Sequence, residues 1–240
     1  ISERLQESLR PISRCAMTTV VAPMGYGKTT AVEWYLAERA RAEAPYIVRI
    51  SVYSGNLAIF WKSVQDAFAR AGFAFLREYD CPTDGASGGL LIDDLCHALT
   101  GEKSCYIFID DFHLLTDKRA PGFLCALAGR LPPNVHLILA SRDLFLPAAE
   151  LVRLGGKVYQ IGTAQLRLNH TELAVYTKRC GTALSDEQID TLLYYSEGWF
   201  SAVYLNLRMF SEHGVLPDPN SDISSIFTAA MIDPLPEKQR

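Results

Sequence analysis

The sequence of 240 residues lacks several features that would place it in familiar classes of protein. No apolar run approaches the roughly 18 residues that a membrane-spanning helix requires, and no signal-peptide pattern is present. Its six cysteines are scattered, without a C-x-x-C pair or a histidine at zinc-ligand spacing. These absences argue against a transmembrane span, a zinc finger and a disulfide scaffold. We therefore expect a soluble, cytoplasmic protein with free thiols.

The chain also lacks an excess of positive charge. It has 23 Lys and Arg residues against 27 Asp and Glu residues, which gives a net charge of −4. A surface that binds DNA needs a basic face to neutralise the phosphates, so we expect no strong DNA binding by this chain. Hydrophobic residues make up 49% and charged residues 21%, a composition typical of a folded domain with a sizeable core.

Internal repeats and low-complexity tracts are absent, and short apolar runs alternate with helical patterns through the first two thirds of the chain. This alternation predicts βαβ units and a mostly parallel sheet. The predicted strands are 18–22, 46–52, 106–110, 136–141 and 158–161. Between the second and third strands, an apolar stripe from Leu57 to Phe68 predicts a helix. The segment 73–89 is rich in turn residues at its end, and we expect it to be a surface loop.

After about residue 165 the strand patterns stop. Asn169 with Glu172, and Ser185 with Gln188, have the spacing of capping boxes and predict two helix starts. A third helix is predicted from the apolar pattern after position 199. The chain begins with Ile1 rather than methionine and ends on a polar stretch, so we interpret it as a segment of a longer protein.

The sequence APMGYGKTT, residues 22–30, differs from the phosphate-loop pattern G-x-x-x-x-G-K-[ST] only at its first position, where Ala22 replaces glycine. Gly27 allows close approach of the backbone, Lys28 suits the β- and γ-phosphates, and Thr29 suits Mg²⁺. Alanine fits the first position if its φ angle is negative. We predict a nucleotide site here, formed by Pro23, Met24, Gly25, Tyr26, Gly27, Lys28, Thr29 and Thr30.

Two adjacent carboxylates, Asp110 and Asp111, follow the buried-strand pattern CYIFI. In the usual arrangement of phosphate-loop proteins, the first acid supports Mg²⁺ and the second polarises the attacking water. We therefore predict Thr29 and Asp110 as metal-binding residues and Asp111 as a catalytic residue. The alternative is that the two acids cap a helix. His113 is more typical of a loop or packing residue than of a ligand.

Arg142 follows the apolar run VHLILAS. Because the carboxyl ends of parallel strands meet where the ligand binds, Arg142 is predicted to reach the γ-phosphate and to act as a second catalytic residue. The alternative is a local ion pair with Asp143.

Six motifs occur together: VVAPMGYGKTT, FWKSVQDAF, FIDDFHLL, HLILASRD, LRLNHTELAVY and YYSEGWFSAVYLNL. In order and spacing they resemble the nucleotide-binding region of MalT-like regulators, which are LuxR-type, ATP-dependent transcription activators of the STAND class of signal-transduction ATPases. That family commonly has alanine at the position of Ala22. Where related proteins often carry G-x-P near the adenine, this chain has Gly198, Trp199 and Phe200.

The resemblance implies an α/β fold, namely a three-layer P-loop NTPase domain with a mostly parallel sheet, followed by a small all-helical domain. We expect the NTPase domain at 1–165, a helical lid at 166–214, and a linker with the start of a winged-helix domain at 215–240. The implied function is an ATP-binding, slowly hydrolysing switch that uses ATP or ADP with Mg²⁺. Its nucleotide state would control domain closure and self-association. DNA binding would belong to a C-terminal domain beyond this chain, and the sequence does not identify the inducer.

The alternative function is a conventional P-loop ATPase motor or a small-molecule kinase. A motor turns over many times per second, whereas a switch hydrolyses slowly and retains its nucleotide. A kinase needs an acceptor pocket and an arginine-bearing lid. A catalytically inactive scaffold is disfavoured because Lys28, Thr29, Asp110 and Asp111 are all present.

Overall fold

The computed structural model describes residues 1–214 and 216, which divide into two compact units. The first unit comprises Ile1–Pro23 and Lys28–Gln165. The second combines Met24–Gly27 with the described residues from Leu166 onward. The linker and winged-helix start expected at 215–240 lie, apart from position 216, outside the described residues.

A five-stranded parallel sheet with the strand order β2-β3-β4-β1-β5 forms the centre of the first unit. The strands are β1 Met17–Val21, β2 Tyr46–Ser51, β3 Cys105–Asp110, β4 Val135–Ser141 and β5 Val158–Ile161. Each bound lies within one residue of its prediction, and the predicted parallel α/β fold is confirmed. Strands β3 and β4 are buried along their whole length, as expected where helices cover both faces of a sheet.

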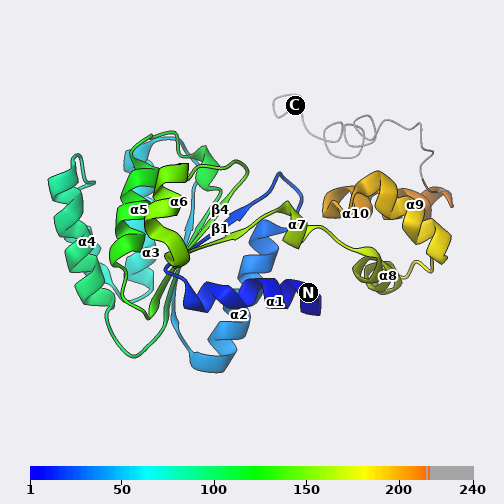
Figure 1. The fold of residues 1–240 in the computed structure, drawn as a ribbon, viewed down its shortest axis with the longest axis horizontal. Helices are drawn as coiled ribbons and strands as arrows, with labels where there is room; N and C mark the ends of the chain where they lie inside the picture. Colours follow the sequence, from blue (N-terminus) through cyan, green and yellow to red (C-terminus); the bar gives the residue numbers. More distant parts are fainter. Residues whose placement is uncertain (215, 217–240) are drawn as a thin grey trace. The chain divides into compact units, whose positions relative to one another are not determined.

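Helices cover both faces of this sheet and give the predicted three layers. They are α1 Glu3–Leu9, α2 Lys28–Glu43, α3 Leu57–Arg70, α4 Gly85–Leu99, α5 Ala120–Arg130 and α6 Ala148–Leu154. The short helix α7 Thr163–Leu166 follows β5 in the chain. Short 3₁₀ helices lie at η1 Arg10–Arg14, η2 Ala74–Glu78, η3 Phe112–Leu114 and η4 Gly155–Lys157. Figure 1 shows α1 and α2 on one face of the sheet and α3 to α6 on the other.

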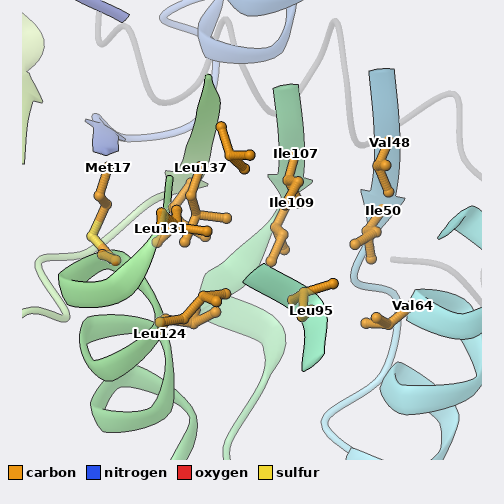
Figure 2. Close-up of a cluster of buried hydrophobic side chains, with 14 of the residues drawn as sticks. Met17, Val48, Ile50, Val64, Leu95, Ile107, Ile109, Leu124, Leu131 and Leu137 are labelled. Atoms are coloured by element: carbon orange, nitrogen blue, oxygen red, sulfur yellow. The ribbon is translucent and has the colours of Figure 1, made fainter. Parts of the chain in front are cut away.

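The larger hydrophobic core lies between the sheet and the layer of α3 to α6. In Figure 2, strand residues such as Ile107 and Leu137 point toward the helices that carry Val64, Leu95 and Leu124. The predicted stripe of α3 faces this core, which confirms that prediction. The core holds the strands rigidly, so that the loops at their carboxyl ends have fixed starting points.

The expectation of a surface loop at 73–89 holds for 79–84, which form neither helix nor strand, and is wrong on either side. The segment begins with η2 and ends in the first turn of α4, and Leu76 within η2 is 1% exposed. A capping box explains the helix start, because the Asp84 side chain accepts a hydrogen bond from Ser87 N and the Ser87 side chain bonds back to the Asp84 backbone. This cap, together with the apolar residues Leu91 and Leu95 further along, overrides the low helix propensity of the glycines.

Three helices form the described part of the second unit beyond α7: α8 His170–Arg179, α9 Asp186–Ser196 and α10 Phe200–His213. Both predicted capping boxes are present, Asn169 with Glu172 and Ser185 with Gln188. A separate core holds the three helices together, and its buried members are Leu173, Ile189, Leu192, Val203 and Leu207.

All six cysteines lie in the described part of the chain, and all are free thiols. Burial raises the pKa of the Cys105 thiol to about 12, which keeps it protonated and unreactive at neutral pH. Among the described residues, no helix combines the length and the apolar character needed to span a membrane.

Alanine substitutions at two glycines of the second unit test how its helices are joined. Gly181 and Gly198 have φ angles of +76° and +72°, so alanine is strained at both. A Cβ at Gly198 would lie 2.2 Å from the Leu168 carbonyl oxygen, whereas a Cβ at Gly181 would meet nothing within 4 Å. We predict that Gly181→Ala lowers the free energy of unfolding by about 1–2 kcal/mol, the penalty of the left-handed backbone.

For Gly198→Ala we predict a clearly larger loss, because the Leu168 backbone must also move. Urea unfolding followed by circular dichroism at the helix band measures both variants. Equal losses for the two variants would show that backbone strain alone sets the requirement for glycine at position 198.

Candidate nucleotide site

The segment after β1, the predicted phosphate loop, contains two glycines in the left-handed conformation. Gly25 and Gly27 adopt φ angles of +81° and +74°, in the left-handed region that favours glycine. Ala22 is not among the residues with positive φ, so alanine fits the first position as predicted. The loop ends at α2, where backbone N–H groups at the helix start favour an anion. Of the predicted nucleotide-binding residues, Pro23, Met24, Thr29 and Thr30 are exposed.

Lys28 is the first residue of α2 and is only 8% exposed. Its Nζ donates hydrogen bonds to the Ala22 carbonyl at 2.7 Å and to the Pro23 carbonyl at 3.0 Å. Burial, followed by the nearby Arg142 guanidinium, lowers the pKa of the ammonium group, while Asp111 and Asp110 act in the opposite direction. The charge is therefore held at the mouth of the loop by two carbonyl dipoles.

Thr29 and Asp110 are joined directly, although 81 residues separate them in the chain. The Thr29 hydroxyl donates to Asp110 Oδ2 at 2.8 Å, and Asp110 Oδ1 accepts from the Asp111 backbone N–H at 2.9 Å. A hydroxyl and a carboxylate at this separation are the oxygen donors that Mg²⁺ prefers beside phosphates. The two residues predicted to bind metal therefore lie together and fit that ion.

Asp111 begins η3 in a left-handed conformation, with a φ angle of +53° and a ψ angle of +37°. Its side chain is 48% exposed and makes no capping hydrogen bond to the turn that follows, so the helix-cap alternative is not supported. A non-glycine residue at positive φ is strained, and such strain is found often at functional sites.

The sheet order brings the end of β4 between the phosphate loop and the acidic pair. In the register of the sheet, Ser141 lies opposite Val21 of β1, while Leu139 lies opposite Ile109 of β3. Arg142, the next residue, is exposed and close enough to Lys28 to lower its pKa. Within the described chain Arg142 forms no ion pair with Asp143, so the alternative of a local ion pair between these two residues is not observed. The structure thus gathers Lys28, Arg142 and both aspartates.

The sequence did not reveal that His113 lies close to the site. Its side chain is 11% exposed, and neither ring nitrogen has a hydrogen-bond partner among the described residues. Nδ1 lies 3.9 Å from Asp111 Oδ1. Burial first, then the positive charge of Arg142, lowers the pKa of the imidazole. The only sequence signal was its position two residues after the acidic pair.

Residues of the GWFS stretch contact the loop residues that cluster with them in the second unit. Trp199 Nε1–H donates to the Met24 carbonyl at 2.9 Å, and the Ser201 N–H donates to the Gly25 carbonyl at 3.2 Å. The rings of Trp199 and Tyr26 stack with centroids 6.3 Å apart. These side chains were not predicted as loop contacts, because the motif pointed to the base of the nucleotide.

No protein-family model matches the chain. Among individual known proteins, the sequence is similar to one type of transcriptional regulator. The chain is 23% identical over 207 residues to the HTH-type transcriptional regulator MalT of Yersinia pestis, covering 85% of this chain and 23% of that protein. A MalT of Yersinia pseudotuberculosis matches to the same extent. The chain resembles the nucleotide-binding region of MalT. It spans about a quarter of the length of the relatives it matches.

Solved structures similar to this MalT-like region confirm the fold. A Walker-type ATPase of Pyrococcus abyssi has a TM-score of 0.54 at 12% identity and covers 94% of this chain and 68% of its own. The Orc1 protein of Aeropyrum pernix, solved in complex with DNA, has a TM-score of 0.53 at 15% identity and covers 94% and 64%. Cdc6p of Pyrobaculum aerophilum has a TM-score of 0.52 at 14% identity and covers 88% and 61%. These structures share the P-loop NTPase-like α/β fold with this chain.

The lowered pKa of His113 makes stability depend on pH. In the unfolded chain the imidazole binds its proton near its ordinary pKa of about 6.5, whereas the folded chain binds it only at lower pH. Stability is therefore lost as the pH falls from about 6.5 through the lower pKa of the folded chain. We predict that His113→Phe, which keeps an aromatic ring, reduces the fall in the urea midpoint between pH 7.5 and pH 5.5.

His136, whose pKa burial also lowers, remains in both proteins and accounts for the part of the pH dependence that the variant keeps. An unchanged difference between the two pH values in His113→Phe would show that His113 is not titrated by unfolding.

Proposed function

We propose that this chain is the ATP-binding, slowly hydrolysing switch module of a signal-responsive, MalT-type transcription regulator. The observation that carries the proposal is the 2.8 Å hydrogen bond from Thr29 to Asp110, which joins the start of α2 to the end of β3. Lys28 and Arg142 supply positive charge beside that pair. The sequence similarity to MalT supports the regulatory setting.

Residues 23–30 are the proposed nucleotide-binding segment. The positive-φ glycines leave the loop backbone open to a phosphate, and a Cβ at Gly27 would meet nothing within 4 Å. Lys28 would exchange its two carbonyl acceptors for β- and γ-phosphate oxygens, which are stronger acceptors because they are charged. Thr29 and Asp110 would hold Mg²⁺, which when bound neutralises part of the phosphate charge.

Two residues are proposed to act on the terminal phosphate. The half-exposed Asp111 carboxylate would orient and polarise the attacking water, and its rigid left-handed backbone would keep that orientation. Arg142 would stabilise the negative charge on the phosphate oxygens as the terminal bond breaks.

The switch itself is proposed to act between residues 1–165, as the NTPase domain, and residues 166–214, as a helical lid. ATP and ADP would favour different degrees of closure, and closure would control self-association. A difference of a few kcal/mol in nucleotide preference between two states suffices for such control. DNA binding and the inducer site would belong to parts of the full-length protein outside this acidic chain.

Removal of the Lys28 charge is the most direct test of the nucleotide site. We predict that Lys28→Ala weakens ATP binding by about 10²-fold or more, since a charged group that hydrogen-bonds two phosphates is lost. Isothermal titration calorimetry with Mg-ATP measures the affinity, and circular dichroism verifies the fold.

Lys62→Ala provides the matched control, because Lys62 is an exposed helical lysine that pairs only with Asp66 at 3.5 Å. It should bind ATP with the parental affinity. Undiminished binding by Lys28→Ala would refute the phosphate-loop assignment.

The second test separates binding from hydrolysis at Asp111. Asparagine tolerates the left-handed backbone as aspartate does, so Asp111→Asn removes the charge without adding strain. We predict parental ATP affinity and a fall in single-turnover hydrolysis of about 10²–10⁴-fold, the usual contribution of a positioned acid–base group. Asp110→Ala should instead weaken the Mg²⁺-dependent affinity for ATP.

Asp143→Asn is the control, because Asp143 is an exposed carboxylate that follows β4 without taking part in the proposed chemistry. Hydrolysis by Asp111→Asn at the parental rate would remove Asp111 from the mechanism. Parental turnover at many cycles per second would favour a motor over a switch.

A further inference from the structure

A cavity of about 410 Å³ lies in the first unit between the sheet and helices α3, α4 and α5. Apolar side chains from the sheet and from all three helices line it, and Figure 2 labels seven of them: Ile50, Val64, Leu95, Ile107, Ile109, Leu124 and Leu137. Ligand pockets in proteins typically have about 300–1,000 Å³ and a mainly apolar lining. The cavity is therefore large enough for a small organic molecule.

The sequence of α4 leaves this space open. Protein interiors are normally packed as densely as organic crystals, with few voids larger than a water molecule. Here Gly85, Gly88 and Gly89 line the cavity from the first turns of a helix, where glycine is otherwise unfavourable. A Cβ at Gly85 or Gly89 would meet nothing within 4 Å, so the absent side chains do not reflect crowding.

The polar groups around the cavity are already paired. The Arg119 guanidinium binds the Asp117 carboxylate at 2.7 Å and donates to the Thr83 carbonyl at 3.1 Å. Trp61 Nε1–H donates to the Tyr79 carbonyl at 3.0 Å, and Arg130 pairs with Asp93 at 2.9 Å. No described lining residue has a buried polar side-chain atom without a partner. A charged ligand would lose its hydration without meeting a buried, unpaired side-chain atom among the described lining residues, whereas an apolar one would displace none of these bonds.

We propose that this cavity is a binding site for a neutral, apolar small molecule, aromatic or aliphatic. All of its lining residues belong to the first unit, and none lies in the phosphate loop. The inference is therefore independent of the proposed nucleotide function. Ile109 lines the cavity and directly precedes Asp110, so the site adjoins the strand that carries the acidic pair.

Toluene and 1-hexanol are suitable probes, with benzoate and hexanoate as their charged counterparts. We expect the intact chain to bind the neutral probes saturably, with Kd on the order of 0.1–1 mM for ligands of this size. At about ten times Kd, the thermal midpoint should rise by about 3 °C. The charged counterparts should give no shift. Absence of saturable binding, or equal binding of benzoate, would overturn the proposal.

Two alanines of α5 provide matched variants. Ala126 lines the cavity, whereas Ala128 is fully buried and does not line it. Ala126→Leu should fill part of the cavity, keep or raise the midpoint of the free protein, and weaken toluene binding at least tenfold. Ala128→Leu overpacks the core and should lower the midpoint but leave the toluene affinity unchanged.

Val64→Phe is a second filling variant, used if Ala126→Leu does not fold, since Val64 lines the cavity from α3. Toluene binding that persists undiminished in a folded filling variant would place the probe elsewhere and refute the assignment.

Discussion

The parallel pairing of β4 with both β1 and β3 is the constraint on which the candidate site depends. It sends three carboxyl ends to one edge of the sheet, so Lys28 after β1, Arg142 after β4 and the two acids at the end of β3 lie close together there. The Thr29–Asp110 hydrogen bond closes this arrangement by tying α2 to β3. A shift of one residue in either pairing would turn Asp110 to the other face of the sheet.

Positively and negatively charged side chains lie close together at this edge of the sheet. Burial, and then repulsion by Arg142, lowers the pKa of Lys28, while both aspartates act in the opposite direction. The carbonyls of Ala22 and Pro23 compensate for the burial of the ammonium group. His113, buried without a hydrogen-bond partner, contributes a neutral ring beside them. Among the described residues, Lys28 and Arg142 therefore lie close together without forming an ion pair with a carboxylate.

Prediction succeeded where the signal was local and failed where two local signals competed. Strand bounds were correct within one residue because β-rich apolar runs ended at turn residues, and the boxes at Asn169 and Ser185 were readable from spacing alone. The end of segment 73–89 was predicted as a loop because its glycines are typical of turns. The capping box at Asp84, which starts α4, was not recognised in the sequence. Those same glycines leave the cavity beneath α4, a property that no pattern of single residues conveys.

The sequence by itself determined the order of strands and helices, the phosphate loop, the acidic pair and the resemblance to MalT-like regulators, because each rests on residues that are near neighbours in the chain. Only the tertiary structure decided that Thr29 bonds Asp110, that His113 is buried beside Asp111, and that a cavity remains between α3, α4 and α5. These features join residues far apart in the chain. They depend on sheet register and on how side-chain volumes fill the space between layers, which local periodicity does not specify.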